Sequence, residues 1–375
     1  MGQKFYTVIC AAALVCALHA CQQSETPASV SLSLPATPYD YNVANDHVPT
    51  LGRVLFYDRR LSVNNSVSCA NCHQQARAFA DGLALSVGFE GARTTRNAMP
   101  IQNLSQIPFI FNNPSDSVVI DDPRFLADTL SLFWDGREKV LEKMVLQPIA
   151  NHVEMGIRDL DELAAKVQAI PEYRKLFTNA YGSDVVTQEN IADALTKFIS
   201  SITTANSRFD QHARGGQPLN ALETFGESLF LTKYNCNSCH QIFALNGYQL
   251  GGGDGEDPGF VNIGLDQIYD DPGHEEVTKN ADDAGRFKIP TLRNVALTGP
   301  YMHDGRFNSL SEVVDHYSSG IKNHPNLDSR LKVSGKAIKM DISEDEKAAI
   351  IAFLETLTDY TMVTDPKFSN PFIVQ

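Results

Sequence analysis

The chain has 375 residues, and its 45 acidic and 31 basic side chains give a formal net charge of −14. This charge argues against nucleic acid as a partner, because phosphates repel an acidic surface. The length suffices for two domains of ordinary size, and no apolar run beyond the N-terminal segment is long enough to cross a bilayer.

The N-terminal segment predicts export from the cytoplasm. Lys4 precedes an apolar run over residues 5–18, which is too short for a stable membrane span, and a small residue stands just before Cys21. We therefore expect a signal peptide over residues 1–21. Residues 22–43 are rich in Ser, Thr, Ala and Pro without an apolar period, which is typical of a flexible tether.

The end of the expected signal resembles the lipobox of bacterial lipoproteins. It reads Leu18-His19-Ala20-Cys21, and in such a box the cysteine takes lipid and becomes the mature N-terminus. His19 is unusual there, so ordinary cleavage without lipid is the alternative. Gln22 after the cysteine favours the outer membrane. We expect a periplasmic protein that contacts the membrane only through a lipid on Cys21.

Four of the seven cysteines fall in two C-x-x-C-H motifs, made by Cys69, Cys72 and His73 and by Cys236, Cys239 and His240. This is the attachment signature of c-type haem: two thiols bond to the haem vinyl groups, and the next residue presents an imidazole to the iron. A zinc centre with four thiolate ligands is the alternative, but it does not explain a histidine directly after each pair. The sequence therefore predicts two covalently bound haem c groups.

The two motifs have similar surroundings. Gly-x-x-Leu-Phe precedes each of them, at residues 52–56 and 226–230. An apolar helix face ahead of C-x-x-C-H is how a cytochrome c domain begins, so we infer duplication of one haem domain. The expected domains span residues 44–214 and 215–362, followed by a tail over residues 363–375.

Other periodic segments predict helices. Apolar residues recur at three- and four-residue spacing over residues 160–167 and 191–202. Ser343 and Glu346 form a capping box before an amphipathic run over residues 348–357. Since no long alternation indicates a large sheet, we expect a mainly α protein.

Three further segments carry a family resemblance: Phe-Trp-Asp-Gly-Arg at 133–137, Val-Glu-Met-Gly at 153–156, and the run over 290–305. Together with the two C-x-x-C-H motifs, they make the chain similar to the bacterial dihaem cytochrome c peroxidase and MauG family over residues 48–357. The resemblance implies two cytochrome c-type haem domains that pack around a shared interface, with long loops. It also implies an enzyme, an oxidoreductase of the cytochrome c peroxidase type.

The resemblance implies roles for individual residues. The haem on His73 would be the peroxide site, and the haem on His240 would carry electrons. Glu154 matches the family's distal carboxylate, which moves a proton between the peroxide oxygens; the alternative is a surface carboxylate. Trp134, the one tryptophan of the sequence, would lie between the haems and carry electrons, a role that is compatible with that of a core aromatic.

Calcium is a further expectation from the resemblance. Asn97, Thr298 and Pro300 match the family's calcium ligands at the domain interface. Their side-chain and backbone oxygens suit this hard cation. We therefore expect one Ca²⁺ beside the two haems.

Three positions depart from the peroxidases of the family. Phe89 stands where a histidine would block the first haem iron, and a phenyl ring cannot ligate, so we expect this iron to be open in the oxidised protein. Tyr317 stands where a methionine would ligate the second haem, as tyrosine does in MauG-type enzymes. The alternative is that Tyr317 only packs and Met302 ligates. Met144 replaces a distal glutamine and cannot donate a hydrogen bond.

Three functions follow from these features. The first is a periplasmic peroxidase that reduces hydrogen peroxide to water with electrons from a small cytochrome c or copper protein. The second is a MauG-like enzyme that uses peroxide to oxidise Trp or Tyr residues of a partner protein. The third is a dihaem electron-transfer cytochrome, although a pure carrier gains nothing from an open iron. The acidic charge suits a basic electron donor, but solubility is the simpler explanation. The sequence is also compatible with a homodimer, as in many relatives.

Overall fold

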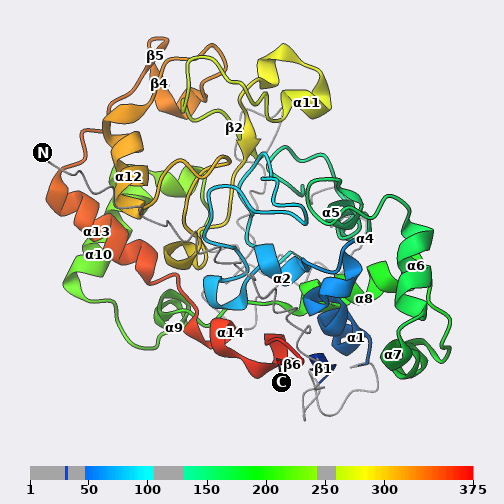
Figure 1. Ribbon diagram of the computed structural model, residues 1–375. Helices are drawn as coiled ribbons and strands as arrows, with labels where there is room; N and C mark the ends of the chain where they lie inside the picture. The colour runs from blue at the N-terminus through cyan, green and yellow to red at the C-terminus, as the bar shows by residue number, and fades with distance from the viewer. Residues whose placement is uncertain (1–29, 33–46, 105–130, 243–258, 375) are drawn as a thin grey trace, which may run out of the picture.

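The computed structural model describes residues 30–32, 47–104, 131–242 and 259–374 (Figure 1). The expected signal peptide and its Cys21 lie outside these residues. Helices dominate the described part, and its strands form only two-stranded antiparallel sheets, which confirms the predicted mainly α class. None of the described helices combines the length and the apolar character needed to span a membrane.

The first domain is built on two crossing helices. α1 (His47–Tyr57) packs against α8 (Gln188–Ser201). The helices cross at Gly52, where a Cβ atom would lie only 1.8 Å from the backbone oxygen of Ala194. Because no other side chain leaves room for so close an approach, the glycine of the Gly-x-x-Leu-Phe segment sets this crossing.

The second domain repeats the crossing. α10 (Ala221–Ser228) packs against α13 (Glu344–Glu355), and a Cβ atom on Gly226 would lie 1.9 Å from a backbone oxygen of α13. A phenylalanine of the partner helix, Phe198 in the first domain and Phe353 in the second, lies 2.8 Å from the added atom in both pairs. Figure 1 shows the two helix pairs at opposite sides of the molecule. The matching contacts support duplication of one haem domain.

The predicted helices lie close to their expected bounds. α6 (Leu160–Gln168) coincides with the first apolar run. α8 begins slightly earlier than its apolar period because the Thr187 side chain caps it. α13 begins directly after Ser343, and the predicted capping box with Glu346 is formed. Local capping chemistry therefore sets where these helices start.

Shorter elements complete the chain. The remaining α-helices of the described residues are α2 (Cys69–Cys72), α4 (Leu141–Met144), α5 (Gln147–Ala150), α7 (Pro171–Tyr181), α9 (Arg208–Ala213), α11 (Glu275–Thr278), α12 (Leu310–Asp315) and α14 (Tyr360–Thr364). π-Helical turns follow α10 and α12, at η4 (Leu229–Lys233) and η8 (His316–Gly320). The strands are β1 (Val30–Leu32), β2 (Phe260–Val261), β3 (Phe287–Lys288), β4 (Lys332–Val333), β5 (Lys336–Ala337) and β6 (Phe372–Val374).

The hydrophobic cores depart from the expected domain bounds at both ends of the second domain. Phe209, on α9, is buried in the second core although it precedes residue 215. Met362 and Phe368 are buried in the first core, although they end or follow the second haem domain in the sequence. β1, within the expected tether, pairs with β6. The C-terminal segment therefore returns to the first domain, which local composition does not reveal.

Candidate functional site

The first C-x-x-C-H motif lies on a short capped helix. α2 begins after Ser68, whose backbone N–H donates to Asn71 Oδ1 at 2.9 Å. Cys69 packs against the edge of the first core. His73 follows the helix, and its Nδ1 lies 2.8 Å from the carbonyl oxygen of Phe79. The thiols and the imidazole are thus presented from one rigid turn.

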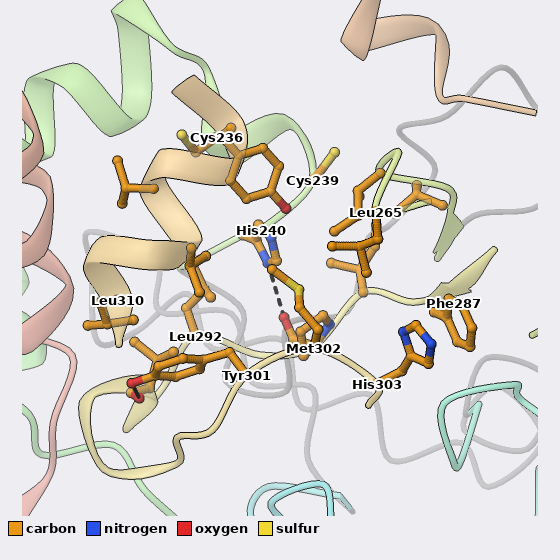
Figure 2. A pocket seen from close by; sticks show the side chains of 18 of the residues that line it. Cys236, Cys239, His240, Leu265, Phe287, Leu292, Tyr301, Met302, His303 and Leu310 are labelled. Carbon is orange, nitrogen blue, oxygen red and sulfur yellow. Dashed lines mark hydrogen bonds between the residues drawn. The ribbon is translucent and has the colours of Figure 1, made fainter. Parts of the chain in front are cut away.

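The second motif borders a large cavity. Its volume is about 270 Å³, and Cys236, Cys239 and His240 all line it (Figure 2). Most of the other lining residues are apolar, and many of the lining residues come from α12, α13 and the segment over 287–303. An apolar cavity that is edged by two thiols and an imidazole suits a covalently bound porphyrin.

Both histidines are held in the form that binds iron. A carbonyl oxygen can only accept, so the contacts of His73 Nδ1 with Phe79 and of His240 Nδ1 with Pro290, at 3.1 Å, favour the tautomer with the proton on Nδ1. Nε2 is then left unprotonated for a metal. Burial lowers the pKa of both imidazoles, that of His240 to about 4, so both are neutral at pH 7.

The two motifs do not form one zinc centre. Among the described residues, which include all four of these cysteines, no three His, Cys, Asp or Glu side chains gather closely enough to hold a metal ion. Each motif instead belongs to its own domain, with its own histidine and its own hydrophobic core. This separation is what two haems require.

The Glu154 segment packs on the loop that contains Phe89. Phe89 N–H donates to the carbonyl oxygen of Glu154 at 3.0 Å. A Cβ atom on Gly88 would lie 1.6 Å from the carbonyl oxygen of Val153, and one on Gly156 would lie 2.6 Å from the Phe89 ring. Glycines at these two positions therefore let the two segments lie in direct contact.

Glu154 lies close to the first centre. Burial is the main reason that the pKa values of the Cys69 and Cys72 thiols are raised, and the Glu154 carboxylate adds to the rise in both. Burial also raises the pKa of the Glu154 carboxyl itself, against a lowering by the Arg137 guanidinium. A carboxyl with increased proton affinity therefore lies within electrostatic reach of the first C-x-x-C-H motif.

Trp134 is held where the two domains meet. Its Nε1–H donates to the carbonyl oxygen of Asn97 at 2.9 Å, and its own carbonyl oxygen accepts from the backbone N–H of Lys288 at 2.8 Å. Asn97 belongs to the first domain and Lys288 lies on β3 of the second. The indole also lines the cavity of the second motif.

Both candidates for the sixth ligand of the second haem line its cavity. Tyr317 lies on η8, and no described residue accepts a hydrogen bond from its hydroxyl. Burial raises the pKa of that hydroxyl well above its usual value. Met302 extends into the cavity, as His240 does, whereas His303 stacks on Phe287 with ring centroids 3.7 Å apart (Figure 2).

The three expected calcium ligands also converge on this cavity. Asn97, Thr298 and Pro300 all line it. Asn97 Nδ2 donates to the carbonyl oxygen of Leu83 at 2.8 Å, and no described residue donates to its Oδ1. Met144, by contrast, is buried in the first core on α4.

Two residues of this interface are not revealed by the sequence patterns described above. His274 lies in a polar stretch of the sequence, but it is buried, with Nδ1 2.7 Å from the carbonyl oxygen of Asp135 and its ring stacked on Phe260 at 3.8 Å. Lys288 was not singled out, although a lone charge between the apolar Phe287 and Ile289 is a signal that the sequence does contain.

Comparisons with known proteins agree with this architecture. A family model described as di-haem cytochrome c peroxidase matches residues 47–218. The methylamine utilization protein MauG of Methylorubrum extorquens is 31% identical over 363 residues, which cover 95% of this chain and 91% of that protein. Cytochrome c551 peroxidase of Nitrosomonas europaea is 31% identical over 335 residues, covering 88% of this chain and 84% of that protein.

A solved structure is similar over nearly the whole chain. It is a MauG-like protein associated with microbial copper homeostasis, with a TM-score of 0.72, 32% sequence identity, and coverage of 90% of this chain and 97% of that one. Similarity of this extent identifies the chain as an oxidoreductase with two haem domains. The chain belongs to the di-haem cytochrome c peroxidase family.

Proposed function

We propose that the protein reduces hydrogen peroxide to water at the haem held by His73, with electrons that a small redox protein delivers through the second haem. The observation that carries this proposal is the packing of Glu154 and Phe89 beside the first C-x-x-C-H motif. It supports a carboxyl that can move a proton next to that centre. It also supports a phenyl ring in the position where a histidine would block the iron.

The protein's own residues supply the routes for protons and electrons. The bound haems would supply the iron chemistry that cleaves the O–O bond. The Glu154 carboxylate takes a proton from one peroxide oxygen and returns it to the other. Its pKa, raised by burial, suits both steps better than that of an exposed glutamate. Trp134, which is hydrogen-bonded to Asn97 and to Lys288, offers an aromatic path for electrons from the second domain to the first.

The proposal also includes a bound calcium ion, a cellular location and an electron donor. Asn97, Thr298 and Pro300 would hold one Ca²⁺ through oxygen atoms at the interface. The protein would work in the periplasm, attached to the outer membrane by a lipid on Cys21. A basic cytochrome c or copper protein would be the donor, since a net charge of −14 attracts it.

The second candidate is a MauG-like oxidase that acts on Trp or Tyr residues of a partner protein. Tyr317 favours it, because a phenolate ligand stabilises the oxidised states of the second haem. Storing oxidising equivalents at both haems would then suit a large protein substrate. An electron carrier without catalysis is disfavoured by the position of Glu154.

Stopped-flow spectroscopy of the fully oxidised protein with peroxide, without reductant, tests the proposal. We expect a rapid change in haem absorbance, because the phenyl ring at position 89 cannot ligate the first iron. Reaction only after addition of one electron would overturn the open site. Steady-state oxidation of a reduced basic cytochrome c by peroxide would then support the peroxidase, while absence of turnover with any small donor would favour the MauG-like oxidase.

A further inference from the structure

Lys288 is a neighbour of Trp134 and lines the cavity of the second motif. It lies on β3, and its backbone N–H donates to the carbonyl oxygen of Trp134 at 2.8 Å. β3 is held in turn by its pairing with Phe260 of β2. The side chain of Lys288 lines the same cavity as Cys239 and His240. The strand therefore fixes the lysine at the border of the cavity, next to the backbone of Trp134.

The described part of the chain supplies no counterion for the ammonium group of Lys288. No described residue forms a hydrogen bond or an ion pair with its Nζ, and burial alone lowers its pKa to about 8. The other cation of the cavity, Arg330, is already paired with Asp328 at 2.7 Å and donates to the carbonyl oxygen of Ser238 at 2.9 Å. A cation that faces an apolar cavity without a partner is costly unless a bound anion completes it.

Haem itself carries the anions that would complete this site. Each haem has two propionate carboxylates, while the rest of its surface is apolar, as is most of the cavity. We propose that Lys288 binds a propionate of the second haem and, by fixing this carboxylate beside Trp134, sets the reduction potential of that haem. Lys288 is thus a positioning residue at the electron-entry site of the proposed function, on which the inference rests.

The charge of Lys288 has a definite effect on the second haem. A nearby positive charge favours the reduced haem, which has one positive charge fewer than the oxidised haem. The lysine also offsets the negative charge of the propionate, which favours the oxidised form. Loss of the ammonium group should therefore lower the reduction potential, and arginine, which keeps the charge, should largely preserve it.

Spectroelectrochemical titration of the haem-loaded protein tests the proposal. For Lys288→Gln we expect the equilibrium constant for reduction of the second haem to fall about tenfold, equal to about 59 mV for one electron. Lys288→Arg should retain the wild-type potential. Lys336→Gln is the matched control, because it removes the same charge from an exposed lysine of β5 that does not line the cavity. An unchanged potential in Lys288→Gln, or an equal shift in Lys336→Gln, would overturn the proposal.

Two further measurements test the role of Lys288 independently of the reduction potential. Resonance Raman spectra of the unmodified protein should place a propionate bending band of the second haem at its hydrogen-bonded frequency, which requires no variant; an unbonded frequency would contradict the proposal. Haem content per chain separates this inference from the proposed function. Two haems with an unshifted potential would remove only the role of Lys288, whereas a wild-type protein with one haem would remove both.

Discussion

Replacing Glu154 by glutamine tests the proposed proton transfer most directly. Glutamine keeps the size of the side chain and the backbone contact with Phe89 N–H at 3.0 Å, but it cannot take up the proton. A positioned general acid–base contributes about 10²–10⁴-fold to a rate, which corresponds to about 3–5 kcal/mol of activation free energy. We expect the reaction of the oxidised protein with peroxide to slow by about this factor.

The assay is stopped-flow absorbance of the first haem after mixing with peroxide. Glu90→Gln is the matched control, because it removes a neighbouring carboxylate that is exposed on the Phe89 loop. We expect this control to react at the wild-type rate. Equal slowing in both variants would indicate a general electrostatic effect, and an undiminished rate in Glu154→Gln would refute the proposed proton transfer.

The pH dependence of the same reaction is an independent test of the role of Glu154. Burial raises the pKa of the Glu154 carboxyl, although Arg137 opposes the shift. The carboxyl therefore holds its proton at a higher pH than a free glutamate does, and the form that accepts a proton disappears as the pH falls through the raised value. The wild-type rate should decline over that acidic range, and the rate of Glu154→Gln should not follow it.

Other substitutions test single features of the structure. Phe89→His should stop the reaction of the oxidised protein with peroxide and restore it after one-electron reduction; an unchanged reaction would mean that position 89 does not face the iron. Tyr317→Phe should change the absorbance spectrum of the second haem, and an unchanged spectrum would leave Met302 as the ligand. Gly226→Ala places its Cβ 1.9 Å from a backbone oxygen of α13, so we expect a loss of about 1–3 kcal/mol in the free energy of unfolding. Thr224→Ala, on the same helix, is the control, and equal unfolding midpoints in chemical denaturation would contradict the tight crossing.

The parts of the fold that depend on local chemistry could be predicted from the sequence. The C-x-x-C-H spacing is dictated by the haem itself, and the Ser343 capping box by the unpaired N–H groups of a helix start. The repeated Gly-x-x-Leu-Phe segment also indicated the duplication, because a glycine at a helix crossing leaves a recognisable trace. In each case, one short segment contains all the atoms that decide the outcome.

Features that depend on distant partners could not be predicted in this way. His274 lies in a polar stretch, but it packs against the ring of Phe260 and contacts the carbonyl oxygen of Asp135, which are both distant in the sequence. Phe368 joins the first core from the far end of the chain, so no local composition could assign it. The surroundings of Lys288 are likewise assembled from separate segments. The burial and pairing of such residues are determined by the tertiary structure.

The duplicated helix crossings and the loops that differ between the two domains affect different properties of the protein. Gly52 and Gly226 make nearly identical crossings in the two domains, so the helices alone give no reason for different haem chemistry. The differences lie in the loops: Phe89 and Glu154 pack together beside the first centre, whereas Lys288 borders the second. Substitutions at the crossings should therefore change the stability of a domain, and substitutions in the loops should change the chemistry of one haem while the fold persists.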